Sequence, residues 1–187
     1  VVFDVIPDGI EAGTFMIATA MCGGDVTLKN IEPNHLTIVT NKLIESGAEI
    51  DVDHSQLRVR MNSRPNSIDM STAIYPGFPT DLQAQWMALM TIAKGSCTVT
   101  DTIYTDRFTH IAELERLGAK IHLDNNVAHI SGVEKLFGAQ VMSTDIRASA
   151  SLVIAGLAAK SETEISRIYH IDRGYESIEG KFLKLGG

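Results

Sequence analysis

The sequence predicts an α/β domain built from three βαβαββ repeats, in which the first helix of each repeat is buried. The same junction residues recur at a spacing of about 70 residues, and self-similarity at a fixed period decides the architecture. The first helix of each repeat carries no charge, whereas the second helix is amphipathic. The hairpins alternate in polarity, which is typical of a sheet with one solvated face. In the first hairpin, Leu57, Val59 and Met61 alternate with Arg58 and Arg60.

The repeat is defined by three sets of aligned junction residues. The sets are Asp8, Asp81 and Asp145; Asn34, Asp106 and Asp172; and Gly47, Gly118 and Gly186. We therefore expect one domain over residues 1–187, with repeats at about 1–62, 63–133 and 134–187. The third repeat stops where the others begin their hairpin. We expect the chain to be cut from a longer protein, with a sheet edge left open near residues 165–168.

The second repeat shows the first half of the unit most clearly. Residues 67–74 are rich in β-branched and apolar side chains and are predicted to form a strand that ends before a Pro/Gly-rich turn. Thr80 or Asp81 is expected to cap a helix over residues 82–93, because short polar side chains favour that position.

The second half of this repeat begins with a Thr/Val/Ile-rich strand over residues 97–103. Asp106 is expected to cap a second helix over residues 107–117, and Gly118 to end it. A hairpin over residues 120–130 completes the unit.

The two sets of helices predict an inner and an outer layer. Residues 12–24, 82–93 and 148–159 form helices without a charged side chain, and helices that are apolar or small all round belong in the interior. The outer helices are amphipathic. The apolar side of the third one is formed by Tyr175, Ile178, Phe182 and Leu185.

Composition and charge exclude several classes of function. A chain with 44% hydrophobic and 21% charged residues is an ordinary globular protein, and its net charge of −7 does not favour nucleic-acid binding. Its charge-free stretches are too short to span a membrane. Cys22 and Cys97 lack motif spacing, are expected to be buried, and indicate a reducing cytoplasm. The histidines form no ligand pattern, so we expect neither metal nor cofactor.

The repeat also predicts where the chemistry lies. The amino-terminal ends of the three inner helices should meet at one end of the domain, where their dipoles favour an anion. The residues expected there are Asp8, Asp81, Asp145 and Arg147, joined by Arg107 and Arg173 at the starts of outer helices. Arginine binds phosphate and carboxylate groups bidentately, so these residues suit a substrate that bears both. For each aspartate, a purely structural role as helix cap stays open.

Five stretches carry a resemblance to a known family. They read PDGIEAGTF, YPGFPTDLQAQ, DRFTHIAELERLGA, VMSTDIRASASLVIAGLAA and RIYHIDRGYESIE. In this order they resemble the carboxyl-terminal domain of the UDP-N-acetylglucosamine 1-carboxyvinyltransferase family. The resemblance implies an inside-out α/β barrel of the enolpyruvyl transferase type. It also implies transfer of the enolpyruvyl group of phosphoenolpyruvate to the sugar 3′-hydroxyl with release of phosphate, the first committed step of bacterial peptidoglycan synthesis.

The same resemblance implies roles for individual residues. The implied substrate-binding set is Asp81, Ile103, Tyr104, Arg107, Asp145, Arg147 and Arg173, of which Asp81 and Arg173 are catalytic. Asp81 would take the proton from the sugar hydroxyl, and Ile103 and Tyr104 would lie against the nucleotide. The three arginines would hold the phosphate and carboxylate groups of phosphoenolpyruvate and of the ketal intermediate.

The chain departs from the family pattern at several positions. Gly9 replaces a usual Arg, Asp106 a usual Asn, and Thr109 and Ser177 a usual Met and Arg. None of these positions carries an implied catalytic role. The family's amino-terminal domain bears a Lys-Asn pair and a loop Cys that protonates the enol carbon, and this chain has neither. We therefore expect the chain to need that domain as a partner and to be inactive alone.

Two alternatives stay open. The sister enzyme 3-phosphoshikimate 1-carboxyvinyltransferase shares the fold and the chemistry. It usually has a Lys-Glu pair before the outer-helix Asp-Arg and Asp-His-Arg at the third inner helix, and residues 103–105 and 145–147 differ from both. A non-catalytic binding module with the same fold is the other alternative. The retention of Asp81 and of all three arginines argues against it.

Overall fold

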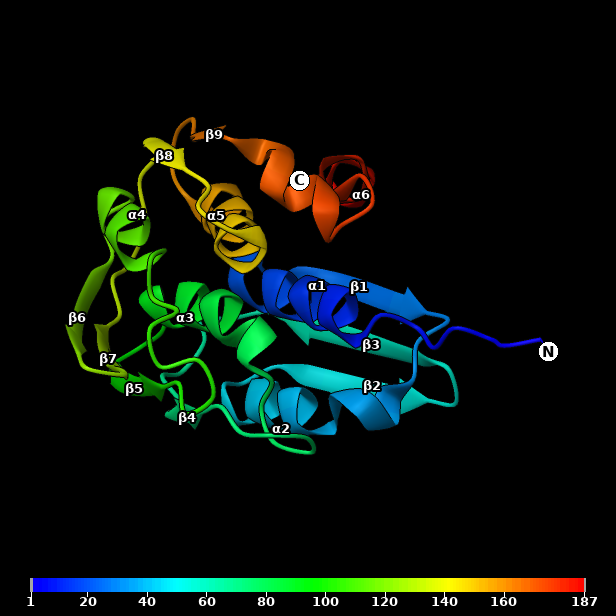
Figure 1. Ribbon diagram of the computed structural model, residues 1–187. Helices are drawn as coiled ribbons and strands as arrows, with labels where there is room; N and C mark the ends of the chain where they lie inside the picture. The colour runs from blue at the N-terminus through cyan, green and yellow to red at the C-terminus, as the bar shows by residue number, and fades with distance from the viewer. Residues whose placement is uncertain (1, 187) are drawn as a thin grey trace.

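Three helices form the centre of the molecule in a computed structural model that describes residues 2–186. They are α1 (Gly9–Cys22), α3 (Gln83–Thr91) and α5 (Ile146–Ala158), and each contacts the other two (Figure 1). Their central side chains, among them Met16, Trp86 and Leu152, are fully buried. This arrangement confirms the predicted inner layer. Val1 and Gly187, the ends of the predicted domain, lie outside the described residues.

Small sheets lie outside the three inner helices. The first sheet consists of β1 (Gly24–Lys29), β3 (Gln56–Met61) and β2 (Glu49–Asp53), in that spatial order and antiparallel. Leu57 and Val59 on β3 point into the core, whereas Arg58 lies on the solvated face with its Nε 2.7 Å from Asp25 Oδ1. The predicted alternation of polarity is therefore confirmed.

The second and third sheets continue the pattern. The second consists of β4 (Met70–Ser71), β5 (Ser96–Thr100), β7 (Val127–Ser131) and β6 (Lys120–Asp124). The third is a parallel pair, β8 (Gln140–Met142) and β9 (Glu164–Ser166). Among the described residues, β9 pairs with β8 alone. The division into repeats at about residues 62 and 133 stays a prediction.

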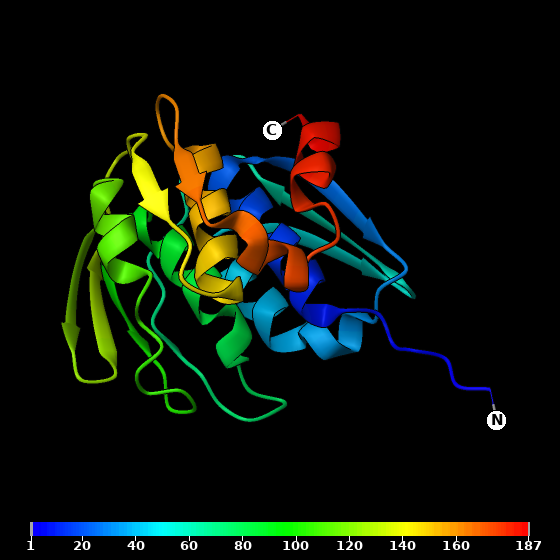
Figure 2. The same cartoon turned by 45° about the horizontal axis from the view of Figure 1, so that its top comes forward.

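The outer helices lie between the sheets (Figure 2). They are α2 (Thr37–Glu45), α4 (Ile111–Arg116) and α6 (Ile178–Leu185), with 3-10 helices at Pro33–Leu36 and Ile168–Arg173. The prediction for the third outer helix holds for three of its four apolar residues. Tyr175, Ile178 and Phe182 are buried, but Leu185 is 53% exposed.

Several predicted element boundaries are wrong. The first inner helix begins at Gly9 rather than at residue 12, and it ends at Cys22 because Gly23 takes a φ of +78° that stops a helix. The strand predicted over residues 67–74 shrinks to Met70–Ser71, because the chain then turns, with Gly77 N–H donating to Ile74 O.

The start of the second outer helix is also wrong. α4 begins at Ile111, and Asp106 is not its cap. The preceding residues form successive tight turns, in which Arg107 N–H donates to Tyr104 O and Ile111 N–H to Phe108 O. These turns use the backbone groups that an earlier helix start would need.

Two expectations from composition can be compared with the structure. Among residues 2–186, no helix is long and apolar enough to cross a membrane, and no group of three metal-ligating side chains comes together. Cys97 is buried as expected, whereas Cys22, at the end of α1, is exposed.

Candidate active site

The three inner helices begin in two different ways. Asp8 and Asp145 cap α1 and α5 with their side chains: Asp8 Oδ1 accepts from Ile10 N at 2.8 Å, and Asp145 Oδ1 accepts from Arg147 N at 2.8 Å. Before α3 stands a 3-10 turn, Thr80–Leu82, which has no side-chain cap. We call this segment the catalytic turn, after the role that we propose for Asp81. The expectation that Thr80 or Asp81 caps the helix is therefore wrong, and the Asp81 carboxylate is available for other partners.

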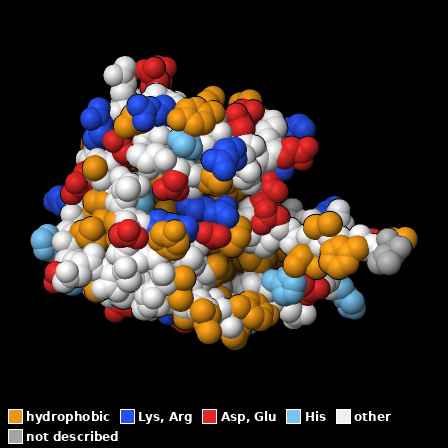
Figure 3. All heavy atoms as spheres, in the orientation of Figure 1, with side chains coloured by type: hydrophobic (Ala, Val, Ile, Leu, Met, Phe, Trp, Pro, Cys, Tyr) orange, Lys and Arg blue, Asp and Glu red, His pale blue; other side chains and the backbone are white. Residues whose placement is uncertain are grey.

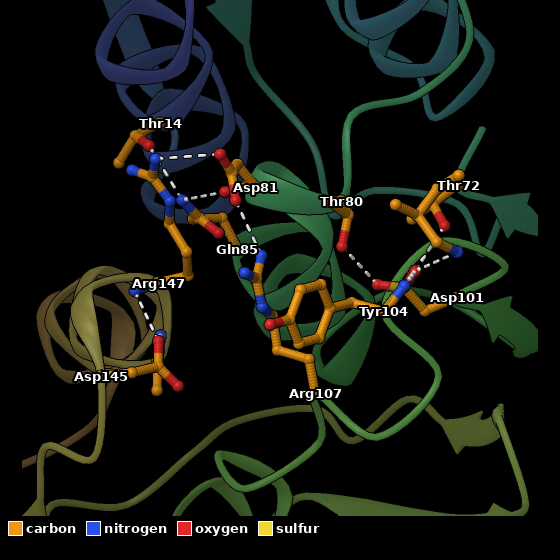
Figure 4. A network of polar contacts seen from close by, with 12 residues as sticks. Thr14, Thr72, Thr80, Asp81, Gln85, Asp101, Tyr104, Arg107, Asp145 and Arg147 are labelled. Atoms are coloured by element: carbon orange, nitrogen blue, oxygen red, sulfur yellow. Dashed lines mark hydrogen bonds and ion pairs between the residues drawn. The ribbon is translucent and has the colours of Figure 1, made fainter. Parts of the chain in front are cut away.

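Those partners are two arginines from different parts of the chain. Arg107 Nη1 donates to Asp81 Oδ1 at 2.7 Å, and Arg147 Nη2 donates to Asp81 Oδ2 at 3.1 Å (Figure 4). The Asp81 side chain is 38% exposed and the arginine side chains 23% and 21%. The carboxylate thus bridges the two guanidinium groups and remains accessible from solvent.

The electrostatic environment keeps Asp81 ionised. Burial is the largest influence on its carboxyl group and raises the pKa. The hydrogen bonds and charges of Arg107 and Arg147 together outweigh burial, so the pKa of Asp81 lies below its ordinary value. Burial likewise lowers the pKa of Arg147, but Asp81 reverses this effect and the net shift is upward. At neutral pH Asp81 is therefore a carboxylate and Arg147 a guanidinium cation.

These groups line one open cavity of about 540 Å³. Its walls include Asp81, Tyr104, Arg107, Asp145, Arg147 and Arg173, which are six of the seven predicted substrate-binding residues. Ile103, the seventh, is 43% exposed on the loop beside the cavity but is not among the lining residues. The space-filling view shows Lys and Arg side chains gathered near the middle of one face (Figure 3). The cavity suits an anionic substrate with groups for more than one arginine.

Arg173 reaches the cavity differently from the prediction. It does not start an outer helix but is the last residue of the 3-10 helix Ile168–Arg173, and α6 begins only at Ile178. Gly174 allows this segment to approach α5, since a Cβ at Gly174 would lie 2.6 Å from Ile146 Cγ2. Arg173 is exposed, and no ion pair with it is formed among the described residues. Its guanidinium group is thus open to a ligand.

Asp8, which was expected at this end, lies elsewhere, and so does Asn34, which aligns with Asp106 in the repeat. Asp8 caps α1 and lines a separate cavity between α1, β1 and α6. Asn34 donates its side-chain amide to Glu32 Oε1 at 2.9 Å. The first repeat therefore adds no charged side chain to the arginine cavity.

A buried polar cluster joins the inner helices beneath Asp81. Gln85 Nε2 lies 3.1 Å from Thr14 Oγ1 and 3.2 Å from Tyr175 OH, and Thr14 Oγ1 lies 2.9 Å from Tyr175 OH. Gln85 Nε2 also donates to Asp81 O at 3.1 Å. The cluster links α1, the start of α3 and the segment that follows Arg173. Sequence reasoning missed it because Thr14, Gln85 and Tyr175 are far apart in the chain.

Sequence reasoning also missed Asp101, which is fully buried. Its Oδ1 accepts from the backbone amides of Ile103 at 2.9 Å and Tyr104 at 2.8 Å, and its Oδ2 accepts from Thr80 Oγ1 at 2.7 Å. An Asp at the end of a strand that bonds to amides two and three residues later is typical of a turn. That local signal was present in the sequence, but the contact with Thr80 was not.

Tyr104 connects this turn to the arginine cavity. The Arg107 guanidinium lies over the Tyr104 ring, 4.3 Å from its centroid, in cation–π geometry. The Tyr104 side chain is 53% exposed, so one part of it supports Arg107 and another remains accessible.

His110 is the titratable group buried behind the cavity. Burial is the main cause that lowers its pKa to about 4, and its Nε2 lies 3.3 Å from Met87 Sδ. His110 is therefore neutral at physiological pH, and it is fully enclosed.

Comparisons with known proteins identify the family of the chain. Residues 1–182 match the family model for EPSP synthase (3-phosphoshikimate 1-carboxyvinyltransferase). Two curated relatives, from Xanthobacter autotrophicus and Desulfosudis oleivorans, both named UDP-N-acetylglucosamine 1-carboxyvinyltransferase, are 56% and 52% identical to the chain over 97% of its length. The chain spans only 43% and 44% of the length of these relatives.

Solved structures show the same fold. The enolpyruvyl transferase NikO from Streptomyces tendae matches with a TM-score of 0.87 and 26% identity, over 97% of this chain and 43% of that one. EPSP synthase from Acinetobacter baumannii matches with a TM-score of 0.64 over 93% of this chain and 44% of that one. Its 16% identity makes this a likeness of fold alone. The predicted fold class, an α/β barrel of the enolpyruvyl transferase type, is confirmed.

Proposed function

The chain belongs to the EPSP synthase family of enolpyruvyl transferases, and from this premise we propose that it forms part of a UDP-N-acetylglucosamine 1-carboxyvinyltransferase. The enzyme would transfer the enolpyruvyl group of phosphoenolpyruvate to the sugar 3′-hydroxyl and release phosphate. The observation that carries the proposal is the Asp81 carboxylate held between Arg107 and Arg147 in the cavity that Arg173 also lines. The names of the two curated relatives favour the nucleotide sugar as acceptor.

In this proposal Asp81 is the general base. The low pKa that the arginines impose makes it a weak base in the resting site. When the phosphate and carboxylate of phosphoenolpyruvate bind these arginines, they compete with Asp81 for the positive charge, and the pKa of Asp81 rises. Asp81 then accepts the proton of the sugar hydroxyl as that oxygen attacks, and general-base help of this kind contributes about 10²–10⁴ in rate.

The reaction proceeds by addition and elimination. The sugar oxygen bonds to the phosphate-bearing carbon of phosphoenolpyruvate while the neighbouring methylene carbon gains a proton, which gives a tetrahedral ketal. The ketal then loses phosphate from the first carbon and a proton from the second, and the enol ether forms. Arg107, Arg147 and Arg173 would hold the phosphate and carboxylate groups through both steps.

The remaining predicted residues take supporting roles in the proposal. Ile103 and Tyr104 present exposed apolar surface beside the cavity, where they would lie against the nucleotide. Asp145 fixes the first turn of α5 and so the position of Arg147, to whose amide it bonds.

The complete activity is proposed for a longer protein, because the chain spans less than half of its curated relatives. We propose that an amino-terminal domain of that protein supplies the proton donor, a loop cysteine, and closes over the cavity. Cleft closure of this kind excludes water and completes a catalytic site. We place the reaction in the cytoplasm, as the first committed step of peptidoglycan synthesis. The unpaired thiols of Cys22 and Cys97 support a reducing compartment.

Product analysis with two acceptors tests the proposal. The full-length protein is incubated with phosphoenolpyruvate and either UDP-N-acetylglucosamine or shikimate 3-phosphate. Phosphate release and the enol ether are measured, and acceptor binding is followed by calorimetry. We expect acceptor binding and product formation with UDP-N-acetylglucosamine but not with shikimate 3-phosphate. Turnover of shikimate 3-phosphate would assign the chain to the sister enzyme, and acceptor binding without turnover would identify a non-catalytic module.

A further inference from the structure

The buried carboxylate of Asp101 has four hydrogen-bond donors and no cation among the described residues. Besides Thr80 Oγ1 and the amides of Ile103 and Tyr104, Thr72 Oγ1 donates to Oδ1 at 2.7 Å. A buried carboxylate is costly unless hydrogen bonds replace its hydration, and these four donors do so. The donors come from three separate segments: the end of β4, the catalytic turn and the loop after β5.

The loop after β5, residues 102–104, is held from both sides, and we call it the nucleotide loop. Thr102 N–H donates to Thr72 Oγ1 at 2.9 Å, and Thr102 Oγ1 donates to Thr72 O at 2.6 Å. Asp101 itself is fixed by the β6–β7 turn, where its N–H donates to Asn126 O and its O accepts from Asn126 Nδ2, both at 3.0 Å. The carboxylate is therefore a rigid anchor.

Two routes, each a series of contacts between residues, connect the Asp101 carboxylate to Asp81, the proposed general base. One runs through the Thr80 hydroxyl to Asp81, the next residue in the chain. The other runs through the Tyr104 amide to the Tyr104 ring, then to the Arg107 guanidinium stacked on it, and finally to Asp81 Oδ1 (Figure 4). A displacement of the nucleotide loop is thus transmitted to Asp81 both through its backbone and through its Oδ1.

We propose that Asp101 is a positioning residue that couples the nucleotide loop to the catalytic turn, so that binding of the nucleotide at Ile103 and Tyr104 aligns Asp81 and Arg107. The inference rests on the proposed function. Asp101 touches no substrate, because it is 0% exposed. It acts only through Thr80 and the two loop amides. Since a misplacement of about 1 Å at a reacting group can cost about 10²-fold in rate, this anchor governs turnover.

Substitution of Thr80 isolates one of the two routes. Thr80→Val keeps the shape of the side chain but removes the hydroxyl that binds Asp101, whereas Thr80→Ser keeps the hydroxyl. In the full-length protein we expect Thr80→Val to lower kcat by about tenfold while the KM of the nucleotide sugar changes by less than about threefold. Thr80→Ser should restore most of the kcat, which a loss of packing alone would not allow.

Substitution of Asp101 cuts both routes at once. We expect Asp101→Ala to lower kcat and also to raise the nucleotide-sugar KM, because the amides of the nucleotide loop and the Thr80 hydroxyl all lose their acceptor. In Thr80→Val/Asp101→Ala, kcat should fall little further than in Asp101→Ala, since both substitutions break the same hydrogen bond.

A control on β5, the strand that precedes Asp101, separates this role from general loss of stability. Thr98 Oγ1 donates to Asp69 Oδ1 at 3.0 Å, which is also a threonine–carboxylate bond, but it is exposed and neither residue lines the arginine cavity. Thr98→Val should leave kcat unchanged. An equal loss in Thr98→Val and Thr80→Val, or an unchanged kcat in Thr80→Val, would overturn the inference. If instead the unsubstituted protein forms no product with the nucleotide sugar, the proposed function itself fails.

Discussion

Asp81 and Asp145 hold the same place in the repeat and differ in their contacts. Asp145 stands directly before α5, and its Oδ1 accepts hydrogen bonds from two backbone amides of the first helical turn, at 2.8 and 2.9 Å. Asp81 lies inside a 3-10 turn before α3, and both of its carboxylate oxygens bind arginines. Asp8, the third member of the set, is a cap like Asp145.

The difference shows how one repeated position acquires chemistry. A capping carboxylate accepts hydrogen bonds from the first backbone amides of its helix. In the 3-10 turn, the carboxylate of Asp81 makes no such bond and can bind other side chains. Arg107 lies in the same predicted repeat as Asp81, whereas Arg147 comes from the next one, where it stands at the start of α5. The repeat brings the helix starts together, and the local backbone determines which aspartate is free to bind the arginines.

The largest expected effect follows from replacing the reactive aspartate. Asp81→Asn in the full-length protein should lower kcat by about 10²–10⁴ while nucleotide-sugar binding persists, because the amide cannot accept the proton. Steady-state kinetics and calorimetry measure the two quantities. Asp8→Asn is the matched control and should turn over normally, since Asn also caps helices well. Near-normal turnover of Asp81→Asn would remove Asp81 from the role of base.

The next effect concerns Arg173, the arginine that the predicted third repeat adds to the cavity. Arg173→Ala should raise the KM of phosphoenolpyruvate by about 10–100-fold, since a charge-assisted hydrogen bond contributes about 1.5–3 kcal/mol and each 1.4 kcal/mol is about tenfold. The affinity for the nucleotide sugar should change little. Arg58→Ala, which removes a surface arginine paired with Asp25, is the control and should leave both unchanged. A loss confined to the nucleotide sugar would contradict this placement of Arg173.

A smaller effect, on the free energy of unfolding, tests whether Asp8 acts as a helix cap. Asp8→Ala should lower the free energy of unfolding by about 1 kcal/mol, because two amides of α1 lose their acceptor. Asp8→Asn should cost only a fraction of that. Chemical denaturation of both variants makes the measurement. If Asp8→Ala proved as stable as Asp8→Asn, the cap would not stabilise α1 and the contrast with Asp81 would lose its basis.

The smallest effect concerns pH. The pKa of Asp81 is lowered in the folded protein, so its stabilisation is fully present above the ordinary pKa and is lost as pH falls through the lower, folded value. Unfolding free energies of the unsubstituted protein and of Asp81→Asn should therefore converge as the pH falls below about 4, the ordinary pKa of Asp. The change should stay under about 1 kcal/mol, because the side chain is 38% exposed and solvent screens the pair. A difference that is constant with pH would contradict the ion pairing.

The repeat made the inner layer and most of the site predictable from the sequence. Charge-free segments predicted the buried helices, and the aligned junctions predicted that Asp81, Arg107 and Arg147 meet. The resemblance added their roles, Arg173 as a catalytic residue, and Tyr104. These inferences depend on periodic patterns and motifs, which a single sequence displays directly.

The remaining features depend on contacts that a linear pattern does not contain. Whether Asp81 caps an α-helix or lies in a 3-10 turn before it depends on how the preceding chain is hydrogen-bonded, and Asp106 failed as a cap for the same reason. The buried role of Asp101 needs Thr72 and Thr80, which lie 29 and 21 residues away. Such contacts form only after the fold is complete.

The bridge from Asp81 to Arg107 and Arg147 means that the resting cavity carries its own counter-ion. An anion that binds Arg107 or Arg147 must exchange with this carboxylate, so the net affinity of that contact is the difference between two ion pairs. A small inorganic anion, which reaches one guanidinium at a time, gains little from that exchange. A ligand with two anionic groups can replace both contacts at once, and the displaced carboxylate becomes more basic as it leaves. In the proposed mechanism, discrimination against small anions and activation of Asp81 as the base would then occur in the same step.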